Sequence, residues 1–403
     1  MSLQGKPVTE VTEQDLRRLI ADRVRESQTL DYKRESYGRN DDQIREMLRD
    51  ISAMASAFGG DLLIGVEEDD ESIASDLYGI ENAEEEAQRI VSSCLSNIQE
   101  RVPGLVAWPV PLSTGRSVIV VRVPQSLRAP HMVTFRGINQ FWARRDRQKT
   151  PLSVYEIKET CLKVERLMEK LERFIGQRKQ EIREKITASP YFAMSVTPLF
   201  VDKEIVDFQD TQLRNLLTGT PGSQASWNVP IGIPPQPTLS GLKSEYPGHE
   251  VSLELFRNGH IELLLDVGGL ENSLYSRLMV DGQEHPIFYG YPLVKYPLSL
   301  FRLSKEVYSY LGITDSVVVS LSLYNIRGFG LAPGAFDPRQ AKYTTRGRNL
   351  IKFWEERKTL EVPLRQVPSL ERPEEIAKEV LDRIWQAFGH DQAPLFDAEG
   401  NIR

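Results

Sequence analysis

The sequence predicts a mixed α/β (α+β) protein in which an alternating strand–helix region is followed by a region rich in short strands. Residues 61–66 form a nearly continuous apolar run, which is typical of a central strand buried on both faces. Residues 44–55 carry an amphipathic helix pattern, and after residue 190 short strands and Pro-rich loops take over. The predicted parts are an α/β sandwich domain at 1–150, a connector helix at 151–188 and a β-rich, mixed α/β domain at 189–403.

Composition indicates an ordinary globular protein. The chain has 403 residues, of which 40% are hydrophobic and 27% charged. Because no apolar run approaches the ~20 residues of a membrane helix and the polar N-terminus lacks a signal-peptide core, we expect a cytoplasmic protein with no membrane partner. Cys94 and Cys161 cannot form a disulfide framework and are predicted to be buried thiols.

The charge pattern limits how nucleic acid could be bound. The net charge is −7, and residues 1–150 carry 20 basic and 24 acidic side chains. Neither half of the chain is broadly basic, so a nucleic-acid-binding protein of this composition needs a local basic patch.

The elements of the first domain follow from capping residues and periodicity. Thr12 is the predicted N-cap of a helix at 11–24, with Asp15 placed as in a capping box. The other predicted elements are a strand at 30–33, a helix from residue 40 or 41 to the Gly59-Gly60 turn, a helix at 84–100, and strands at 117–123 and 138–145.

The second half begins with a long helix predicted at 153–187. Its heptad pattern is imperfect, so we interpret it as a connector helix and as a candidate dimer helix. Asn258-Gly259 between two apolar runs predicts a β-hairpin. The remaining predicted elements are a helix at 298–311, a strand at 316–326 and a helix at 373–388. No family is recognised in residues 190–403.

A group of charged residues near the first strand has the chemistry of a phosphodiester-cleaving site. Asp31 and Lys33 share one strand face, so the carboxylate could hold Mg²⁺ or Mn²⁺ and the lysine could orient the attacking water. Glu26 converges with them only if it lies in the preceding helix end or turn. A third carboxylate would come from Glu67, Glu68 or Asp69, of which strand parity favours Glu67.

A plainer interpretation of the same residues is structural. Asp31 and Lys33 could form a solvated strand face, and the acidic run at 67–71 is typical of a surface turn. Residue types and spacing alone favour this interpretation over a nuclease. Gly59-Gly60 is likewise interpreted as a helix stop, and no P-loop is present, so nucleotide hydrolysis is not predicted.

Residues 26–33 and 57–67 together resemble the signature of the Schlafen AlbA-type domain. They contain an acidic residue, a strand reading Asp-Tyr-Lys, a helix, a Gly-Gly turn and a strand reading Leu-Leu-Ile-Gly-Val-Glu. The resemblance covers about residues 12–160 and implies a catalytic metal triad. By position Glu26 and Asp31 match its first two members, with Asp31 in place of a glutamate, and Glu67 or Asp69 supplies the third.

A basic strand end is the predicted nucleic-acid contact. Arginine can bind phosphate in bidentate fashion and aromatic rings can stack on bases. The alternative is a solvated strand end beside a core aromatic residue. The predicted contacts are Arg122, Trp142, Arg144, Arg145, Arg147 and Lys149.

Three functions remain open from the sequence. The first is a metal-dependent endoribonuclease of Schlafen type acting on structured RNA such as tRNA, a role that the resemblance connects with phage defence. The metal would be Mg²⁺ or Mn²⁺, held by Glu26, Asp31 and Glu67 or Asp69, with Lys33 assisting the water. The second is a non-enzymatic DNA- or RNA-binding regulator with a C-terminal sensor. The third is an assembly subunit that forms a homo-oligomer through the 153–187 helix.

Overall fold

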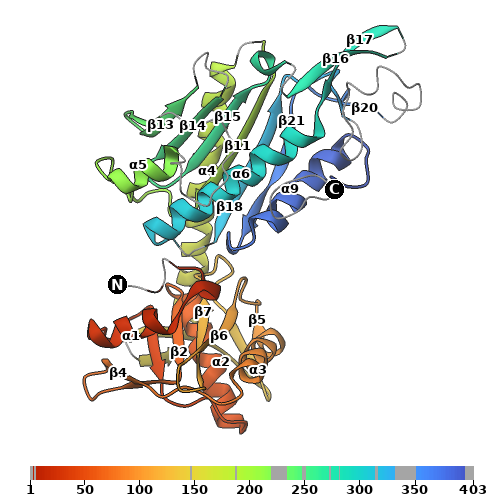
Figure 1. Cartoon of the computed structure of the whole chain (residues 1–403). Helices are drawn as coiled ribbons and strands as arrows, with labels where there is room; N and C mark the ends of the chain where they lie inside the picture. Colours follow the sequence, from red (N-terminus) through yellow and green to blue (C-terminus); the bar gives the residue numbers. More distant parts are fainter. Residues whose placement is uncertain are drawn as a thin grey trace. The chain divides into compact units, whose positions relative to one another are not determined.

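The computed structural model shows a mixed α/β protein, as predicted (Figure 1). Contacts divide the chain into two compact units, Met1–Glu172 with Gly312–Ser316 and Arg173–Leu311 with Val317–Arg403. No helix in the described ranges is both long enough and apolar enough to cross a membrane. The structure describes residues 3, 6–145, 148–186, 188–218, 234–246, 251–271, 274–280, 282–313, 316–331 and 351–394; at 145 and 148 only the backbone is described.

The N-terminal unit contains a sheet of β1 (Leu30–Lys33), β2 (Gly60–Ile64), β7 (Ser117–Val123) and β6 (Val106–Pro111), in that order. β1 and β2 are parallel, with Asp31 opposite Leu62, and the other neighbours are antiparallel. The apolar run predicted as one strand is divided at Gly65, whose φ is 100°. The chain then continues into β3 (Val66–Glu68), which pairs with β4 (Ala74–Leu77).

A second sheet of the N-terminal unit carries the predicted basic strand end. Its order is β10 (Gln148–Pro151), β9 (Ile138–Arg145), β8 (Met132–Phe135) and β5 (Ile98–Gln99), with all neighbours antiparallel. In the β9–β10 hairpin Arg144 is opposite Lys149. These two cations therefore lie side by side on paired strands.

Helices cover both faces of the first sheet. α1 (Glu13–Ala21), preceded by the 3₁₀ turn η2 (Val8–Glu10), packs Leu16 on one face. The predicted capping box is present, because the Thr12 amide and hydroxyl both donate to Asp15 Oδ2, at 2.9 and 2.7 Å. On the other face lie α2 (Asp41–Ser56), capped by Asn40, and α3 (Ala83–Asn97).

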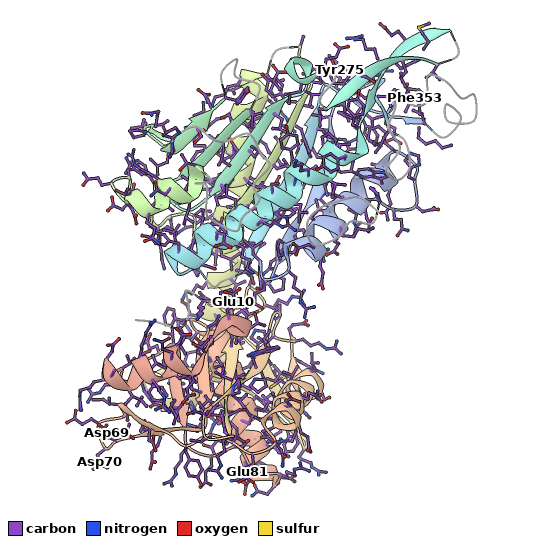
Figure 2. The ribbon with its side chains drawn as sticks, in the orientation of Figure 1. Glu10, Asp69, Asp70, Glu81, Tyr275 and Phe353 are labelled. Atoms are coloured by element: carbon purple, nitrogen blue, oxygen red, sulfur yellow. The ribbon has the colours of Figure 1, made fainter. Side chains whose placement is uncertain are left out.

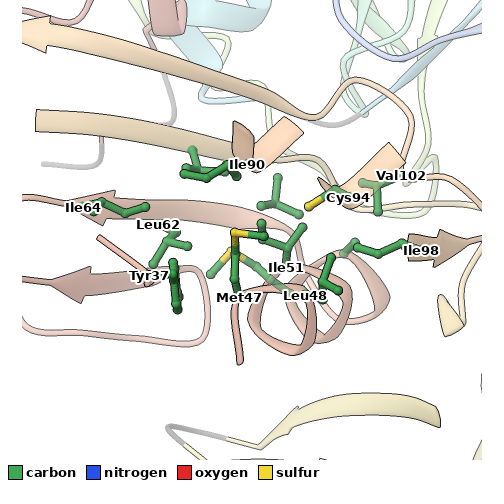
Figure 3. Packing of buried hydrophobic residues seen from close by; sticks show 14 of the residues in the cluster. Tyr37, Met47, Leu48, Ile51, Leu62, Ile64, Ile90, Cys94, Ile98 and Val102 are labelled. Atoms are coloured by element: carbon green, nitrogen blue, oxygen red, sulfur yellow. The ribbon is translucent and has the colours of Figure 1, made fainter. Parts of the chain in front are cut away.

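The larger hydrophobic core of this unit lies between α2, α3 and the first sheet (Figure 3). Met47, Leu48 and Ile51 of α2 are fully buried among side chains of β2 and α3. Cys94 belongs to this core, as predicted, but Cys161 is exposed on the next helix, so the prediction for Cys161 is wrong. Its position on that helix is not covered by any other element in the described structure.

Glycine is required where α2 ends. Gly59 has a φ of 66° and its amide donates to Met54 O at 2.9 Å, which closes the helix. A Cβ on Gly60 would lie 2.3 Å from the Thr29 carbonyl oxygen, so the start of β2 approaches β1 more closely than any larger residue allows. The interpretation of Gly59-Gly60 as a helix stop is confirmed.

The predicted connector is the helix α4 (Val154–Lys185). Ser153 caps it: the Ser153 amide donates to Glu156 Oε2 at 2.8 Å and the Glu156 amide donates back to Ser153 Oγ at 3.3 Å. Its residues are divided between the two compact units after Glu172.

The C-terminal unit is rich in strands, as predicted. Its large sheet has the order β12 (Gln236–Pro237), β13 (Gly241–Glu245), β14 (Val251–Phe256), β15 (Ile261–Asp266), β11 (Tyr191–Pro198), β18 (Val317–Tyr324), β21 (Leu360–Val367). The hairpin predicted around Asn258-Gly259 is the antiparallel β14–β15 pair. A smaller sheet has the order β16 (Tyr275–Val280), β17 (Gln283–Phe288), β19 (Gly330–Leu331), β20 (Lys352–Phe353).

Two helices, α6 (Gly290–Leu311) and α9 (Pro373–Ala387), lie on one face of the large sheet, and the second half of α4 lies on the other (Figure 1). The helix predicted to start at residue 298 starts at Gly290 instead, with Pro297 inside it. An interior proline costs a helix about 3 kcal/mol, and burial of the preceding turn, including Leu293 and Val294, offsets this. The remaining elements are α5 (Thr211–Thr218) and η3 (Gly268–Leu270).

Candidate nucleic-acid site

The structure brings Glu26 to β1 by a tight turn. The Ser27 amide donates to Leu30 O at 3.0 Å, which folds the preceding segment back along the strand. Glu26 Oε1 then accepts the Tyr32 amide at 2.8 Å, on an edge strand of the sheet. Glu26 and Asp31 therefore converge from opposite ends of the turn, as the hypothesis required.

Asp31 is the centre of the site and is only 3% exposed. Lys33 Nζ lies 3.1 Å from its Oδ1, while Arg144 Nη1 lies 2.7 Å and Lys149 Nζ 3.6 Å from its Oδ2. These three cations come from three strands, β1, β9 and β10. We call Lys33, Arg144 and Lys149 the cation cluster.

A second buried carboxylate, Asp50 of α2, also belongs to the site, and sequence reasoning missed it. Its Oδ2 accepts Lys149 Nζ at 2.7 Å and the Tyr37 hydroxyl at 2.8 Å, and it is 1% exposed. The signal was a charged residue beside the apolar stripe of α2, three positions after Met47. Such a residue is buried with the stripe and requires a cationic partner.

Neighbouring charges separate the pKa values of the two central carboxyl groups. Burial, a hydrogen bond with Asp31 and the charge of Asp31 raise the pKa of Glu26 to about 7, and Glu68 adds to this. Burial also acts to raise the pKa of Asp31, but the hydrogen bond with Glu26 and the charges of the cation cluster outweigh it and lower that pKa. Below neutral pH the pair therefore holds one proton, on Glu26, and around neutral pH Glu26 loses it.

The lysine of the site remains charged. Burial acts to lower the pKa of Lys33, but the charges of Asp31 and Asp50 outweigh it and raise that pKa. The Lys33 side chain is 28% exposed, so it reaches solvent beside the buried carboxylates.

The predicted third carboxylates, Glu67 and Asp69, have other partners. Glu67 forms an ion pair with Arg34 at 3.1 Å. Asp69 Oδ1 accepts the amides of Glu71 and Ile73 at 2.9 and 3.0 Å, so it stabilises the outer β3–β4 turn (Figure 2). The acidic side chain of β3 whose charge raises the pKa of Glu26 is Glu68.

The arrangement does not fit a preformed Mg²⁺ or Mn²⁺ site. Both oxygens of Asp31 are already bound by cations, which would repel a divalent ion. Within the described part of the chain, no three His, Cys, Asp or Glu side chains form a metal-binding group. The metal ligands Glu26, Asp31, Glu67 and Asp69 thus remain a prediction from the resemblance, and a third ligand would have to move in.

The predicted nucleic-acid contacts divide into internal and peripheral residues. Arg122 differs from expectation: it is 9% exposed and donates to both oxygens of Asp61 at 2.8 and 3.1 Å. Trp142 is also 9% exposed, with the Arg49 guanidinium 5.1 Å from its ring centre. Both side chains have partners inside the N-terminal unit, because a buried guanidinium needs a carboxylate and a buried indole packs in the core.

Two other predicted contacts, Arg144 and Lys149, lie around Asp31. The Arg144 side chain is 1% exposed and Lys149 is 13% exposed, both as members of the cation cluster. Arg145 is described only in its backbone, opposite Gln148, and Arg147 lies outside the described residues. The sequence that supplies these strands is strongly basic: residues 101–150 contain nine Lys and Arg and one Asp.

One family model matches this part of the chain. Residues 26–153 match the family model described as Schlafen, AlbA_2. The predicted resemblance is thereby confirmed for the N-terminal domain. The match contains all the residues of the site, and it supports a nucleic-acid-binding role for this part of the chain.

Two solved structures are similar over part of the chain. One is a crystal structure of a Corynebacterium diphtheriae protein, 19% identical, with a TM-score of 0.26; 36% of this chain and 27% of that protein are covered. The other is the solution structure of the N-terminal domain of a Nitrosomonas europaea protein described as ATP-dependent DNA helicase RecG-related, 22% identical, with a TM-score of 0.26; the coverage is 35% and 88%. No curated protein matches the chain.

Proposed function

We propose that the N-terminal unit binds nucleic acid, RNA in preference to DNA, at the face where Lys33 reaches solvent. The observation that carries the proposal is the cation cluster around Asp31, within the range that matches Schlafen AlbA_2. Three cations face Asp31 and Asp50, and Glu26, with a pKa of about 7, carries only part of a negative charge at neutral pH. The site therefore keeps a positive excess that suits a phosphate group.

The decisive experiment is a salt titration of RNA binding by Lys33→Ala. Lys33 is the partly exposed member of the cluster, whereas Arg144 is buried and its reversal would damage the fold. Each phosphate contact on a single strand contributes about 0.7 to the slope of log K against log salt. We expect Lys33→Ala to weaken binding about tenfold and to reduce that slope by about 0.7.

Lys158→Ala is the matched control, since Lys158 is exposed on α4 in the same unit. It should leave both affinity and slope unchanged. Equal affinities and slopes for the wild type and Lys33→Ala, with an unchanged thermal transition, would refute the proposed binding face. A DNA strand of the same sequence, run beside the RNA, tests the preference for RNA.

A second candidate, cleavage of RNA, is favoured by the separated pKa values of Glu26 and Asp31. Pairs of carboxyl groups with pKa values moved apart are typical of acid–base sites. With a pKa of about 7, Glu26 can accept a proton from an attacking hydroxyl and donate it to a leaving oxygen. Lys33, beside it, could stabilise the charge that develops on the phosphate.

The cleavage assay uses end-labelled tRNA, single-stranded RNA and DNA with Mg²⁺, Mn²⁺ or EDTA, for the wild type and Glu26→Gln. Cleavage lost in Glu26→Gln but retained in EDTA would show that carboxyl chemistry suffices. Cleavage lost in EDTA would show that Mg²⁺ or Mn²⁺ takes part, as the resemblance implies. If no substrate is cut under any condition while binding persists, the protein is a binding module and the nuclease candidate fails.

The remaining parts of the hypothesis concern self-association and the role in the cell. α4 exposes Val154 and Tyr155, each 71% accessible, and Leu162, 43%, which supports a homo-oligomer formed through this helix. Light scattering at micromolar concentration tests it, and a monomer would count against it. A role in phage defence follows only from the resemblance and requires a challenge assay in cells. In that role the C-terminal unit would be a sensor or a substrate-selecting module.

A further inference from the structure

The C-terminal unit contains a large groove that is separate from the candidate nucleic-acid site. Its volume is about 860 Å³. The loop before β21, the strand itself, the end of α9 and the last turn of α4 line it. Small-molecule sites usually occupy about 300–1,000 Å³, so the groove has the size of a binding site for a compact ligand.

The lining of the groove has more cations than anions. Its basic residues are Arg183, Arg357, Lys358 and Arg383, and its acidic residues are Glu356 and Glu361. Glu361 is engaged by Arg183 and, at 3.0 Å, by Lys179. Within the described residues no carboxylate forms an ion pair with Arg357, Lys358 or Arg383. In a chain with a net charge of −7, this local excess of positive charge favours the binding of an anion.

The loop that carries the two adjacent cations is held firmly. The Trp354 indole donates to Arg357 O at 2.7 Å, and the Ile326 amide donates to Lys358 O at 2.9 Å. Trp354 is further fixed by backbone hydrogen bonds with Phe329 and Gly328, at 2.9 and 2.8 Å. The anchored backbone fixes where the exposed Arg357 and Lys358 side chains start, so the loop itself loses little freedom when a ligand binds, which favours affinity.

Helix capping explains only one of the four cations. Arg183 lies in the last turn of α4, where a positive charge stabilises the helix end without any ligand. Arg357 and Lys358 lie in the loop, outside any helix, and Arg383 lies before the last turn of α9. Arg357 and Lys358 are therefore the residues on which a binding role depends.

We propose that this groove binds a phosphorylated small molecule of nucleotide size. Arg357, Lys358 and Arg383 would hold the phosphates, because guanidinium groups pair with phosphate oxygens in bidentate fashion. The apolar lining, Leu360, Val362 and Ala387, would accommodate the uncharged part of the ligand, and Gln386 offers hydrogen bonds to it. A compact ligand suits a hollow bordered by three elements better than an extended strand of nucleic acid does.

The test is isothermal titration of the full chain with ATP, AMP, adenosine and pyrophosphate. We expect ATP to bind more tightly than AMP and adenosine to bind least, because the phosphates supply the attraction. The double variant Arg357→Glu with Lys358→Glu should weaken ATP binding at least tenfold. Arg372→Glu is the matched control, since Arg372 is exposed at the opposite end of α9 and does not line the groove.

Three outcomes would overturn the inference. ATP could bind the double variant and the wild type equally, or no phosphorylated probe could bind more tightly than about 1 mM. The double variant could also lose affinity for RNA alone, which would make the groove a nucleic-acid surface. Lys33→Ala should leave ATP binding unchanged, so this inference and the proposed function of the N-terminal unit fail or succeed separately.

Discussion

Each unit buries charged side chains against a sheet, but the charges are balanced in different ways. In the C-terminal unit Glu262 of β15, 3% exposed, has Arg178 of α4 at 2.7 Å and His260 at 3.5 Å. In the N-terminal unit Asp31, equally buried, meets three cations, and Glu26 beside it titrates near neutral pH. The first arrangement is a matched pair, and the second has excess charge.

Accessibility and pKa values support the same distinction. Burial acts to raise the pKa of Glu262, but hydrogen bonds from His260 and Arg178 outweigh it and lower that pKa. His260 also contacts the buried Thr197, with Nδ1 2.9 Å from the hydroxyl oxygen. All three residues of this hydroxyl–imidazole–carboxylate series are at most 3% exposed, so no substrate reaches them. Burial with full pairing indicates structure, whereas partial exposure with excess charge indicates a site.

The largest effect is expected from Arg178→Ala. It removes the Arg178 ion pair from the buried Glu262, and breaking a buried pair costs about 3–5 kcal/mol. Hydrogen exchange of the β15 amides measures the loss locally. The double variant Arg178→Met with Glu262→Leu should recover most of it, and a single-variant cost below about 1 kcal/mol would mean that the pair is not structural.

A smaller effect is expected from Arg144→Ala. Asp31 keeps Lys33 and Lys149, so the loss is that of charged hydrogen bonds, about 1.5–3 kcal/mol. Urea unfolding followed by hydrogen exchange of β1 measures it. The comparison between the units would break down if Arg144→Ala destabilised the N-terminal unit as much as Arg178→Ala destabilises the C-terminal unit.

The smallest effect is a dependence of stability on pH that Glu26→Gln should remove. The folded pKa of Glu26, about 7, lies above its ordinary value of 4.5. Between these values the native state binds more protons than the unfolded state, so stability falls as pH rises. With solvent screening we expect a loss of about 1 kcal/mol. Thermal unfolding from pH 5 to 8 measures it, and identical curves for Glu26→Gln and wild type would contradict the assignment.

The site was only partly predictable because its partners are distant in sequence. Glu26, Asp31 and Lys33 were accessible to sequence reasoning, since a turn and a strand fix them within eight residues of one another. Arg144 lies 113 positions from Asp31, and Asp50 comes from α2. Basic residues at a strand end suggested exposed contacts, but the pairing of β9 with β10 turns Arg144 toward a buried carboxylate.

The sequence by itself determined the local elements: the Thr12–Asp15 capping box, the apolar stripe of α2, the Gly59-Gly60 stop, the β14–β15 hairpin and the Schlafen AlbA_2 signature. Periodicity, capping and turn chemistry act over a few residues and can therefore be detected in the sequence. Only the tertiary structure decided that Arg122 forms an ion pair with Asp61, that the charge of Glu68 raises the pKa of Glu26, and that a cationic groove lies beside β21. Those features depend on strand order and burial, which decide which charges lose water and must find one another.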